Sequence, residues 1–251
     1  MYGLKYSIPF KTLSNVDCVV NVELKDYIGS SMELIGGGEP FVIETDDGDV
    51  LTPIRSSLAT LCVFGSDYLQ DLYASDPQGV RVTLLVDGNV NWLGYMTPDT
   101  FSQDFSSPEF VYEVECVSAL STLKLIDFDI ENDFVSFLQI IKRARDLAGY
   151  DKLYLTNSIR ANSGSFYDLN IATANFFDEL GEAMTYYEVL EEIAKYAGCC
   201  FTPYQDDLYL LDYKAISSGF NLYEKYDGDT KTLVTVASSD TVANYRGTGL
   251  S

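Results

Sequence analysis

The sequence of 251 residues contains no histidine, and this absence removes several kinds of active site. Histidine is the usual general base, the commonest zinc ligand and the group that activates serine and cysteine nucleophiles. Hydrolysis by two carboxylic acids needs no histidine, but it needs the pair roughly 5–10 Å apart in a cleft. No spacing of acidic residues selects such a pair, so we predict no catalytic residues.

Basic residues are scarce: 16 lysines and arginines stand against 38 acids, which gives a net charge of −22. Binding to nucleic-acid phosphates depends on clustered lysine and arginine, and so does docking on an anionic membrane. We therefore expect no sequence-specific nucleic-acid binding. A surface this acidic is soluble and repels DNA.

Long apolar runs are also missing. No window approaches the ~18 apolar residues of a membrane-spanning helix, so we expect no membrane insertion. The N-terminal residues MYGLKYSIPFKTLS lack the apolar core of about 7–15 residues that a signal peptide needs. The sequence therefore predicts synthesis in the cytoplasm without a signal peptide.

The five cysteines are odd in number and lack C-x-x-C spacing: Cys18, Cys62, Cys116, Cys199 and Cys200. Three of them lie in alternating apolar runs, where cysteine behaves as a small buried apolar residue. We predict free, buried thiols in a reducing compartment. For the adjacent Cys199 and Cys200 we favour opposite faces of a strand over a strained vicinal disulfide.

Residues 1–125 are rich in alternating apolar and polar residues, the pattern of half-buried strands. At least six strands are predicted there, together with one short helix at Ser66–Ala74. Asp87-Gly88 joins two of the strands, since both turn positions tolerate positive φ. The pattern indicates an antiparallel β-barrel or sandwich domain over residues 1–125. The predicted strands include Val16–Leu24, Phe41–Glu44, Leu58–Phe64, Val80–Val86, Val90–Gly94 and Phe110–Val117.

Two loops in this part resemble ligand-binding loops only superficially. Gly36-Gly37-Gly38 has neither the lysine nor the spacing of a phosphate-binding or dinucleotide-binding loop, so we interpret it as a turn that breaks the chain before a strand. Thr45–Asp49 lacks the residue order and the bidentate glutamate of a calcium loop. We interpret it as a hairpin tip.

Residues 126–215 predict a smaller α+β domain, which opens with four acids at every second position: Asp127, Asp129, Glu131 and Asp133. A metal site is one interpretation. However, Asn132 stands where a calcium loop needs glycine, and Leu138 stands where it needs glutamate. We favour an edge strand with outward acids that runs into a helix capped by Asn132 or Asp133. No metal ligands are predicted.

The first helix of this domain is predicted near 134–148, and Gly149 ends it. A strand at Lys152–Thr156 follows. The loop Asn157–Met184 is long and polar, with Phe176 and Phe177 as its expected anchors. The apolar stripe of the helix comprises Phe134, Phe137, Leu138, Ile141, Ala144 and Ala148.

The second helix is predicted near 186–197. Thr185 and Glu188 have the spacing of a capping box, and Gly198 stands where a left-handed residue ends a helix. Its apolar stripe comprises Tyr186, Val189, Leu190, Ile193, Ala194 and Ala197, and a hairpin of Cys199–Tyr204 and Leu208–Tyr213 follows.

Residues 216–251 are rich in glycine, serine and threonine, and a strand is predicted at Lys231–Ala237. The final residues Arg246–Ser251 contain no closing element. We therefore expect 216–251 to form a strand and a junction to a further β-rich part. The predicted fold class is α+β, mostly β.

Four stretches, in this order, resemble tail proteins of bacteriophages and prophages of gut Bacteroidetes. The class is the baseplate hub, which joins the tail tube to its spike or fibre. The stretches are Leu34–Glu44, Leu51–Ser57, Val86–Gly94, and the opening of the second predicted helix, in which Gly181-Glu182 precedes Met184-Thr185 and Tyr187-Glu188-Val189-Leu190.

The resemblance implies a structural protein of the virion tail: a homotrimeric ring built from β-barrel-like domains and a smaller α+β domain. The implied partners are further copies of the chain, the tail tube or distal tail protein, and spike or fibre proteins. Family members are usually longer, and Arg246–Gly249 resembles the lead into a further β-rich part. No catalytic, cofactor-binding or metal-binding residues carry over.

Three functions follow as hypotheses. The first is a hub ring whose acidic surface partly lines a channel for DNA, which it repels so that the DNA slides. The second is a β-rich module that binds carbohydrate through some of the 19 tyrosines, since tyrosine is common at interfaces. The third is a carboxylate-pair hydrolase.

Overall fold

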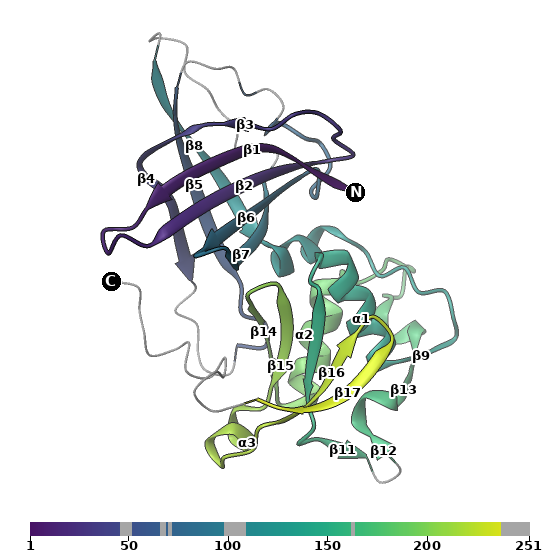
Figure 1. The fold of residues 1–251 in the computed structure, drawn as a ribbon. Helices are drawn as coiled ribbons and strands as arrows, with labels where there is room; N and C mark the ends of the chain where they lie inside the picture. The colour runs from purple at the N-terminus through teal and green to yellow at the C-terminus, as the bar shows by residue number, and fades with distance from the viewer. Residues whose placement is uncertain (46–51, 66–68, 70–71, 98–108, 162–163, 237–251) are drawn as a thin grey trace. The chain divides into compact units, whose positions relative to one another are not determined.

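The computed structural model describes the chain except residues 46–51, 66–68, 70–71, 98–108, 162–163 and 237–251 (Figure 1). The chain forms two compact units, one of residues 1–46 and 56–122 and the other of residues 47–55 and 123–251. Both contain large sheets, and the predicted class, α+β and mostly β, is confirmed. The predicted hairpin tip at Thr45–Asp49 and helix at Ser66–Ala74 lie mostly outside the described residues.

The first unit is one eight-stranded sheet in the order β3-β1-β2-β6-β7-β8-β5-β4. Its outermost strands, β3 and β4, are separated in the chain only by Leu34, whose N–H donates to the carbonyl of Ser7 in β1 at 2.9 Å. The sheet therefore closes into a barrel, which leaves it no free edge. The strands are β1 (Tyr2–Lys11), β2 (Asp17–Lys25), β3 (Met32–Glu33), β4 (Ile35–Thr45), β5 (Ser57–Gly65), β6 (Val80–Val86), β7 (Asn89–Met96) and β8 (Phe110–Ser118).

The barrel core consists of the inward residue of each alternating pair. In β5, for example, Ala59, Leu61 and Val63 are buried in the core, whereas Leu58 is exposed. The hairpin between β6 and β7 turns at Asp87 (φ 48°) and Gly88 (φ 79°), which confirms the predicted Asp-Gly turn with two positive φ angles.

The second unit contains a five-stranded sheet in the order β14-β15-β10-β16-β17, in which only β10 and β15 are parallel. Helix α1 packs against β10, α2 packs against β14, and the two helices contact each other. The strands are β10 (Lys152–Thr156), β14 (Cys200–Tyr204), β15 (Asp207–Leu211), β16 (Leu222–Asp227) and β17 (Thr230–Thr235), and the helices are α1 (Phe137–Ala148), α2 (Tyr186–Ala197) and α3 (Tyr213–Ser217).

Short elements complete this unit. They are the two-stranded pairs β9 (Phe134–Ser136) with β13 (Asn170–Ala172) and β11 (Arg160–Ala161) with β12 (Gly164–Ser165), and the 3-10 turns η4 (Phe166–Asp168) and η5 (Thr173–Phe176). A further turn, η3 (Ala119–Leu125), leads out of the barrel. No described helix has both the length and the apolar character to span a membrane.

The strands after residue 216 belong to the same sheet as the rest of this unit. We expected 216–251 to form a strand and a junction to a further β-rich part; within this range residues 223–227 of β16 pair with β10, and β17 pairs with β16. The physical reason is that β10 has an unpaired side once β15 has paired with it, and a buried strand needs both sides satisfied.

Helix α2 begins and ends as predicted. Thr185 and Glu188 form the reciprocal capping box, and Gly198 ends the helix at φ 66°. Glu191 and Lys195 also form an i,i+4 ion pair at 3.3 Å on the exposed side of the helix. Five residues of its predicted stripe are buried, from Tyr186 to Ala194.

The start of α1 differs from the prediction. Neither Asn132 nor Asp133 caps it; the N-cap is Ser136, which forms a capping box with Gln139. Phe134, predicted to lie on the apolar stripe, is instead exposed in β9, and Ile140 takes a place on the buried face. The reciprocal Ser136–Gln139 bonds satisfy two backbone donors, which fixes the first turn three residues later than expected.

One edge of the five-stranded sheet is covered by a segment from far away in the sequence. The N–H of Phe201 in β14 donates to the carbonyl of Pro53, and the N–H of Arg55 donates to the carbonyl of Phe201, both at 2.8 Å. Ile54, between them, is 2% exposed. The segment thereby satisfies backbone groups of an edge strand that would otherwise be open.

Candidate functional site

The glycine triplet is a bulge within one strand, not a turn between two. Gly36 pairs with Val63 and Phe41 pairs with Leu61, so the four residues from Gly37 to Pro40 stand opposite Cys62 alone. A Cβ on Gly37 would lie 2.3 Å from the sulfur of Cys62. Glycine is needed here because the bulge folds closely over that thiol. This use of glycine is structural.

The acidic run Asp127–Asp133 is not an edge strand. It makes a single β-bridge, from Asp127 to Thr185. The next residue, Phe128, is buried and packs on Phe176 and Tyr186, with ring centroids 4.9 and 5.4 Å apart. Phe176 is buried, as expected of an anchor.

One acid of this run, Asp129, joins both helices of the unit. Its carboxylate accepts from Arg143 of α1 at 2.6 Å and from the hydroxyl of Tyr186 of α2. The hydrogen bond from Arg143 lowers the pKa of Asp129, and burial together with Asp129 raises the pKa of Tyr186. The carboxylate is thus ionised and held by protein partners at neutral pH. Among the described residues, no three side chains of the histidine, cysteine or carboxylate type lie close enough to hold a metal ion.

All five cysteines are free and buried, as predicted. Burial raises the pKa of Cys199 to about 12 and raises the pKa of Cys62 and Cys116 as well. A thiol in this state is protonated at neutral pH, and only the thiolate is a good nucleophile. These cysteines therefore act as small apolar core residues.

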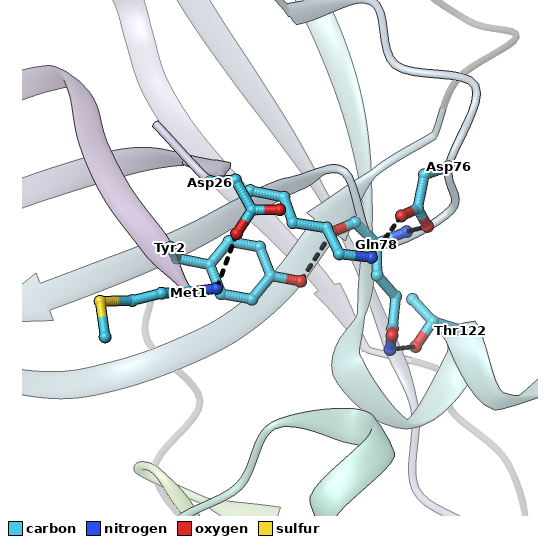
Figure 2. Close-up of polar contacts among 7 residues, drawn as sticks. Met1, Tyr2, Asp26, Asp76, Gln78 and Thr122 are labelled. Carbon is cyan, nitrogen blue, oxygen red and sulfur yellow. Dashed lines mark hydrogen bonds and ion pairs between the residues drawn. The ribbon is translucent and has the colours of Figure 1, made fainter. Parts of the chain in front are cut away.

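A polar cluster on the barrel joins its first strand to the segment before β6 (Figure 2). The hydroxyl of Tyr2 donates to the carbonyl of Gln78 at 2.6 Å, and the side-chain amide of Gln78 donates to Thr122 at 3.2 Å. Lys25 binds the carboxylate of Asp76 at 2.6 Å and lowers its pKa. Since these donors and acceptors bind one another, we interpret the cluster as a structural link between β1, β2, the segment before β6 and η3.

A buried carboxylate, Glu224, lies in β16 and is 3% exposed. It accepts from the hydroxyl of Tyr226 and pairs with the ammonium group of Lys231, both at 2.8 Å. A hydroxyl from Ser165 adds a longer contact of 3.4 Å. A buried charge with this many partners is a fixed structural group. The sequence prediction missed it.

The sheet face that carries Tyr154 and Tyr209 is lined with tyrosines. These two rings stack 4.3 Å apart with an angle of 4° between them, and Tyr209 and Tyr223 are buried. Ile216 of α3 packs against this face. The rings are therefore buried against one another, whereas carbohydrate recognition needs exposed aromatic faces. Nothing in this arrangement favours the carbohydrate hypothesis.

No protein-family model matches this sequence, and comparison with curated protein sequences finds no match. Two solved structures resemble the fold. The 43 kDa tail protein of prophage MuSo2 from Shewanella oneidensis is 16% identical, with a TM-score of 0.44 over 68% of this chain and 50% of that one. The tail protein from Neisseria meningitidis MC58 is 13% identical, with a TM-score of 0.45 over 91% of this chain and 74% of that one.

Both of these proteins are tail proteins by name, the Shewanella one from a prophage, and the chain spans half the length of the Shewanella protein. Likenesses this distant assign neither a family nor a function.

Proposed function

We propose that this chain is a non-catalytic structural component of a bacteriophage or prophage tail, of the baseplate hub type that joins the tail tube to a spike or fibre. Its partners in that role are further copies of itself, in a ring of three, and the neighbouring tail proteins. It is made in the bacterial cytoplasm and resides in the virion tail.

The proposal is supported by the structural role of the four stretches that resemble hub proteins. Leu34–Glu44 contains the bulge over Cys62, and Leu51–Ser57 contains the segment that covers the edge of β14. Val86–Gly94 contains the β6–β7 turn, and Thr185–Leu190 begins α2 with its capping box. Each of these four features determines the local fold of the chain. The resemblance therefore lies in the fold-determining positions, as expected of a protein whose function is assembly.

The charge of the chain supports the finer form of the proposal. A net charge of −22 gives a ring of three copies a strongly negative surface. A negative bore repels phosphate, so DNA passes without binding. We propose that acidic residues line part of such a channel. On a trimer, a neutral or basic bore would contradict this part of the proposal.

Two measurements test the role. Light scattering on the full-length protein should give the mass of three chains, and a stable monomer at high concentration would contradict the ring. Antibodies against the chain should label one end of the tail in particles released from the bacterium that encodes it. Particles that lack the chain altogether would contradict a virion role of any kind.

A further inference from the structure

The wall of the barrel is divided by charge. All four basic residues of 1–46 and 56–122 lie on the neighbouring strands β1, β2 and β6. Three of the four form ion pairs within the barrel: Lys11 with Asp17 at 2.8 Å, Lys25 with Asp76 at 2.6 Å, and Arg81 with Glu23 at 2.8 Å. The fourth, Lys5, lies over the ring of Tyr27 at 4.7 Å. This side of the barrel is electrically balanced.

The strands β4, β5 and β8 contain no lysine or arginine. Glu113 and Glu115 project outward from β8, since their neighbours Tyr112, Val114 and Cys116 are buried in the core. Glu39 is exposed in the bulge of β4. None of these three acids forms an ion pair with the described residues. This side is therefore acidic without internal compensation.

An apolar row crosses the same three strands. Ile35 of β4 stands opposite Phe64 of β5, and Phe64 stands opposite Val111 of β8. The three residues are 68%, 37% and 53% exposed. Side chains opposite each other on neighbouring strands lie roughly 5 Å apart, so they form one continuous strip. Val63 and Tyr112, the residues next in sequence to Phe64 and Val111, point into the core. The strip is therefore on the outside of the barrel and does not contribute to its core.

We propose that this acid-bordered row, Ile35–Phe64–Val111, is a docking surface for another protein whose contact surface has an apolar centre bordered by lysine or arginine. Stable interfaces combine an apolar centre with a polar rim, and charge complementarity at the rim selects the partner. The proposal rests on the barrel alone and does not depend on the tail role.

A second copy of the chain is the poorer occupant. Two such rows facing each other would bring Glu113 and Glu115 of both copies together, and like charges at an interface oppose binding. The other side of the barrel does not supply the missing cations, because its lysines and arginine already have partners. Six basic residues of the other unit also form ion pairs: Lys142, Arg143, Arg145, Lys152, Lys195 and Lys231. We therefore assign the complementary charge to a different protein.

The test uses the full chain and a short fluorescent peptide in which leucine and lysine alternate. Anisotropy should show binding to the wild type that weakens as salt rises, because exposed charges are screened. The variant Phe64→Ser/Val111→Ser should weaken binding by at least about tenfold. The variant Glu113→Gln/Glu115→Gln should also weaken it and flatten the salt dependence. Since all four side chains face outward, thermal unfolding should stay unchanged.

The matched control is Leu13→Ser/Ile28→Ser, which removes two apolar side chains that are fully exposed elsewhere on the barrel. It should bind the peptide as the wild type does. Hydrogen exchange with the peptide bound should slow at residues 57–65 and 110–118. Slowing at 17–25 and 80–86 instead would overturn the proposal.

Two further outcomes would also overturn it. One is equal binding of a peptide in which leucine alternates with glutamate, because the rim would then have no selectivity. The other is self-association in sedimentation velocity that Phe64→Ser/Val111→Ser abolishes, because the occupant would then be a second copy.

Discussion

The two units of this chain bury their apolar residues by different means. The barrel closes one sheet on itself, so most of its core lies inside that sheet, and Leu69 and Leu72 from the segment before β6 add to it. The α+β unit keeps an open sheet, which needs helices on one face, packed tyrosines on the other and a covering segment on one edge. Each unit is therefore vulnerable to a different kind of substitution. The barrel depends on close approaches between neighbouring strands, such as that of Gly37 in β4 to Cys62 in β5, and the open sheet depends on the segments that cover it.

The difference also decides which surfaces are available. The faces of the open sheet are covered by parts of the same chain, whereas several apolar side chains on the described outer wall of the barrel are exposed, among them Ile35, Phe64 and Val111. An apolar residue that points out from a barrel strand therefore meets solvent or a partner. This is why the row Ile35–Phe64–Val111 stands out on the barrel.

The largest effect is expected from removing helix packing in the open-sheet unit. Leu190 of α2 is fully buried, so Leu190→Ala should lower the free energy of unfolding by about 2–5 kcal/mol. Urea unfolding measures this. The control Leu180→Ala, at a residue that is 86% exposed, should change little. Equal stability of the two variants would show that the helices do not hold the sheet.

A slightly smaller decrease in the free energy of unfolding is expected when the segment that covers the sheet edge is weakened. Ile54→Ala should cost about 2–3 kcal/mol, at the lower end of the range for buried isoleucine, because a short covering segment can relax. Hydrogen exchange should accelerate at the amide of Phe201, which donates to Pro53. Acceleration in β5 instead would assign Ile54 to the barrel and break the division drawn between the units.

Close packing between β4 and β5 of the barrel is tested at the bulge. Gly37→Ala should destabilise the protein by about 1–3 kcal/mol, as other overpacking substitutions do, since its Cβ would meet the sulfur of Cys62 at 2.3 Å. Gly38→Ala is the control, because no atom lies within 4 Å of its added Cβ. The double variant Gly37→Ala/Cys62→Ala should recover most of the loss. Failure of this rescue would contradict the close approach.

The end of α2 gives a smaller effect of a different origin. Gly198 has φ 66°, so Gly198→Ala should cost about 1 kcal/mol through backbone strain alone. No atom lies within 4 Å of the added Cβ, so no neighbouring substitution should rescue it. The melting temperatures of the wild type and the variant, measured by thermal unfolding, give the difference in stability. A wild-type melting temperature would mean that the left-handed cap is not required.

The smallest effect concerns acid stability. Arg143 lowers the pKa of Asp129, so the folded state binds fewer protons there than the unfolded state. The resulting stability is present above the ordinary carboxyl pKa of about 4 and is lost as pH falls through the lowered value. Both side chains are about half exposed, so the contribution is at most about 1 kcal/mol. Asp129→Asn should remove this part of the acid dependence, measured by unfolding at several pH values. An unchanged pH profile would assign the dependence to other acids.

Much of the fold could be predicted where one local signal sufficed. The β6–β7 turn follows from Asp87-Gly88, and the limits of α2 follow from Thr185, Glu188 and Gly198. Strand β1 was missed because Pro9 and a register shift between Leu4 and Tyr6 interrupt its alternation. Strand β16 was missed because Glu224, a charged residue, is buried in it beside Tyr226.

What the sequence by itself determined is local: the strand periods, the capping boxes, the left-handed glycines and the strong excess of acids. Only the tertiary structure placed Gly37 over Cys62, Ile54 beside Phe201, and Ile35, Phe64 and Val111 in one row. The physical reason is the separation along the sequence of the residues that interact. A cap or a turn is decided by residues within a few positions of one another. Strand neighbours are decided by the whole chain, because closing a long loop costs entropy that many distant contacts must repay together.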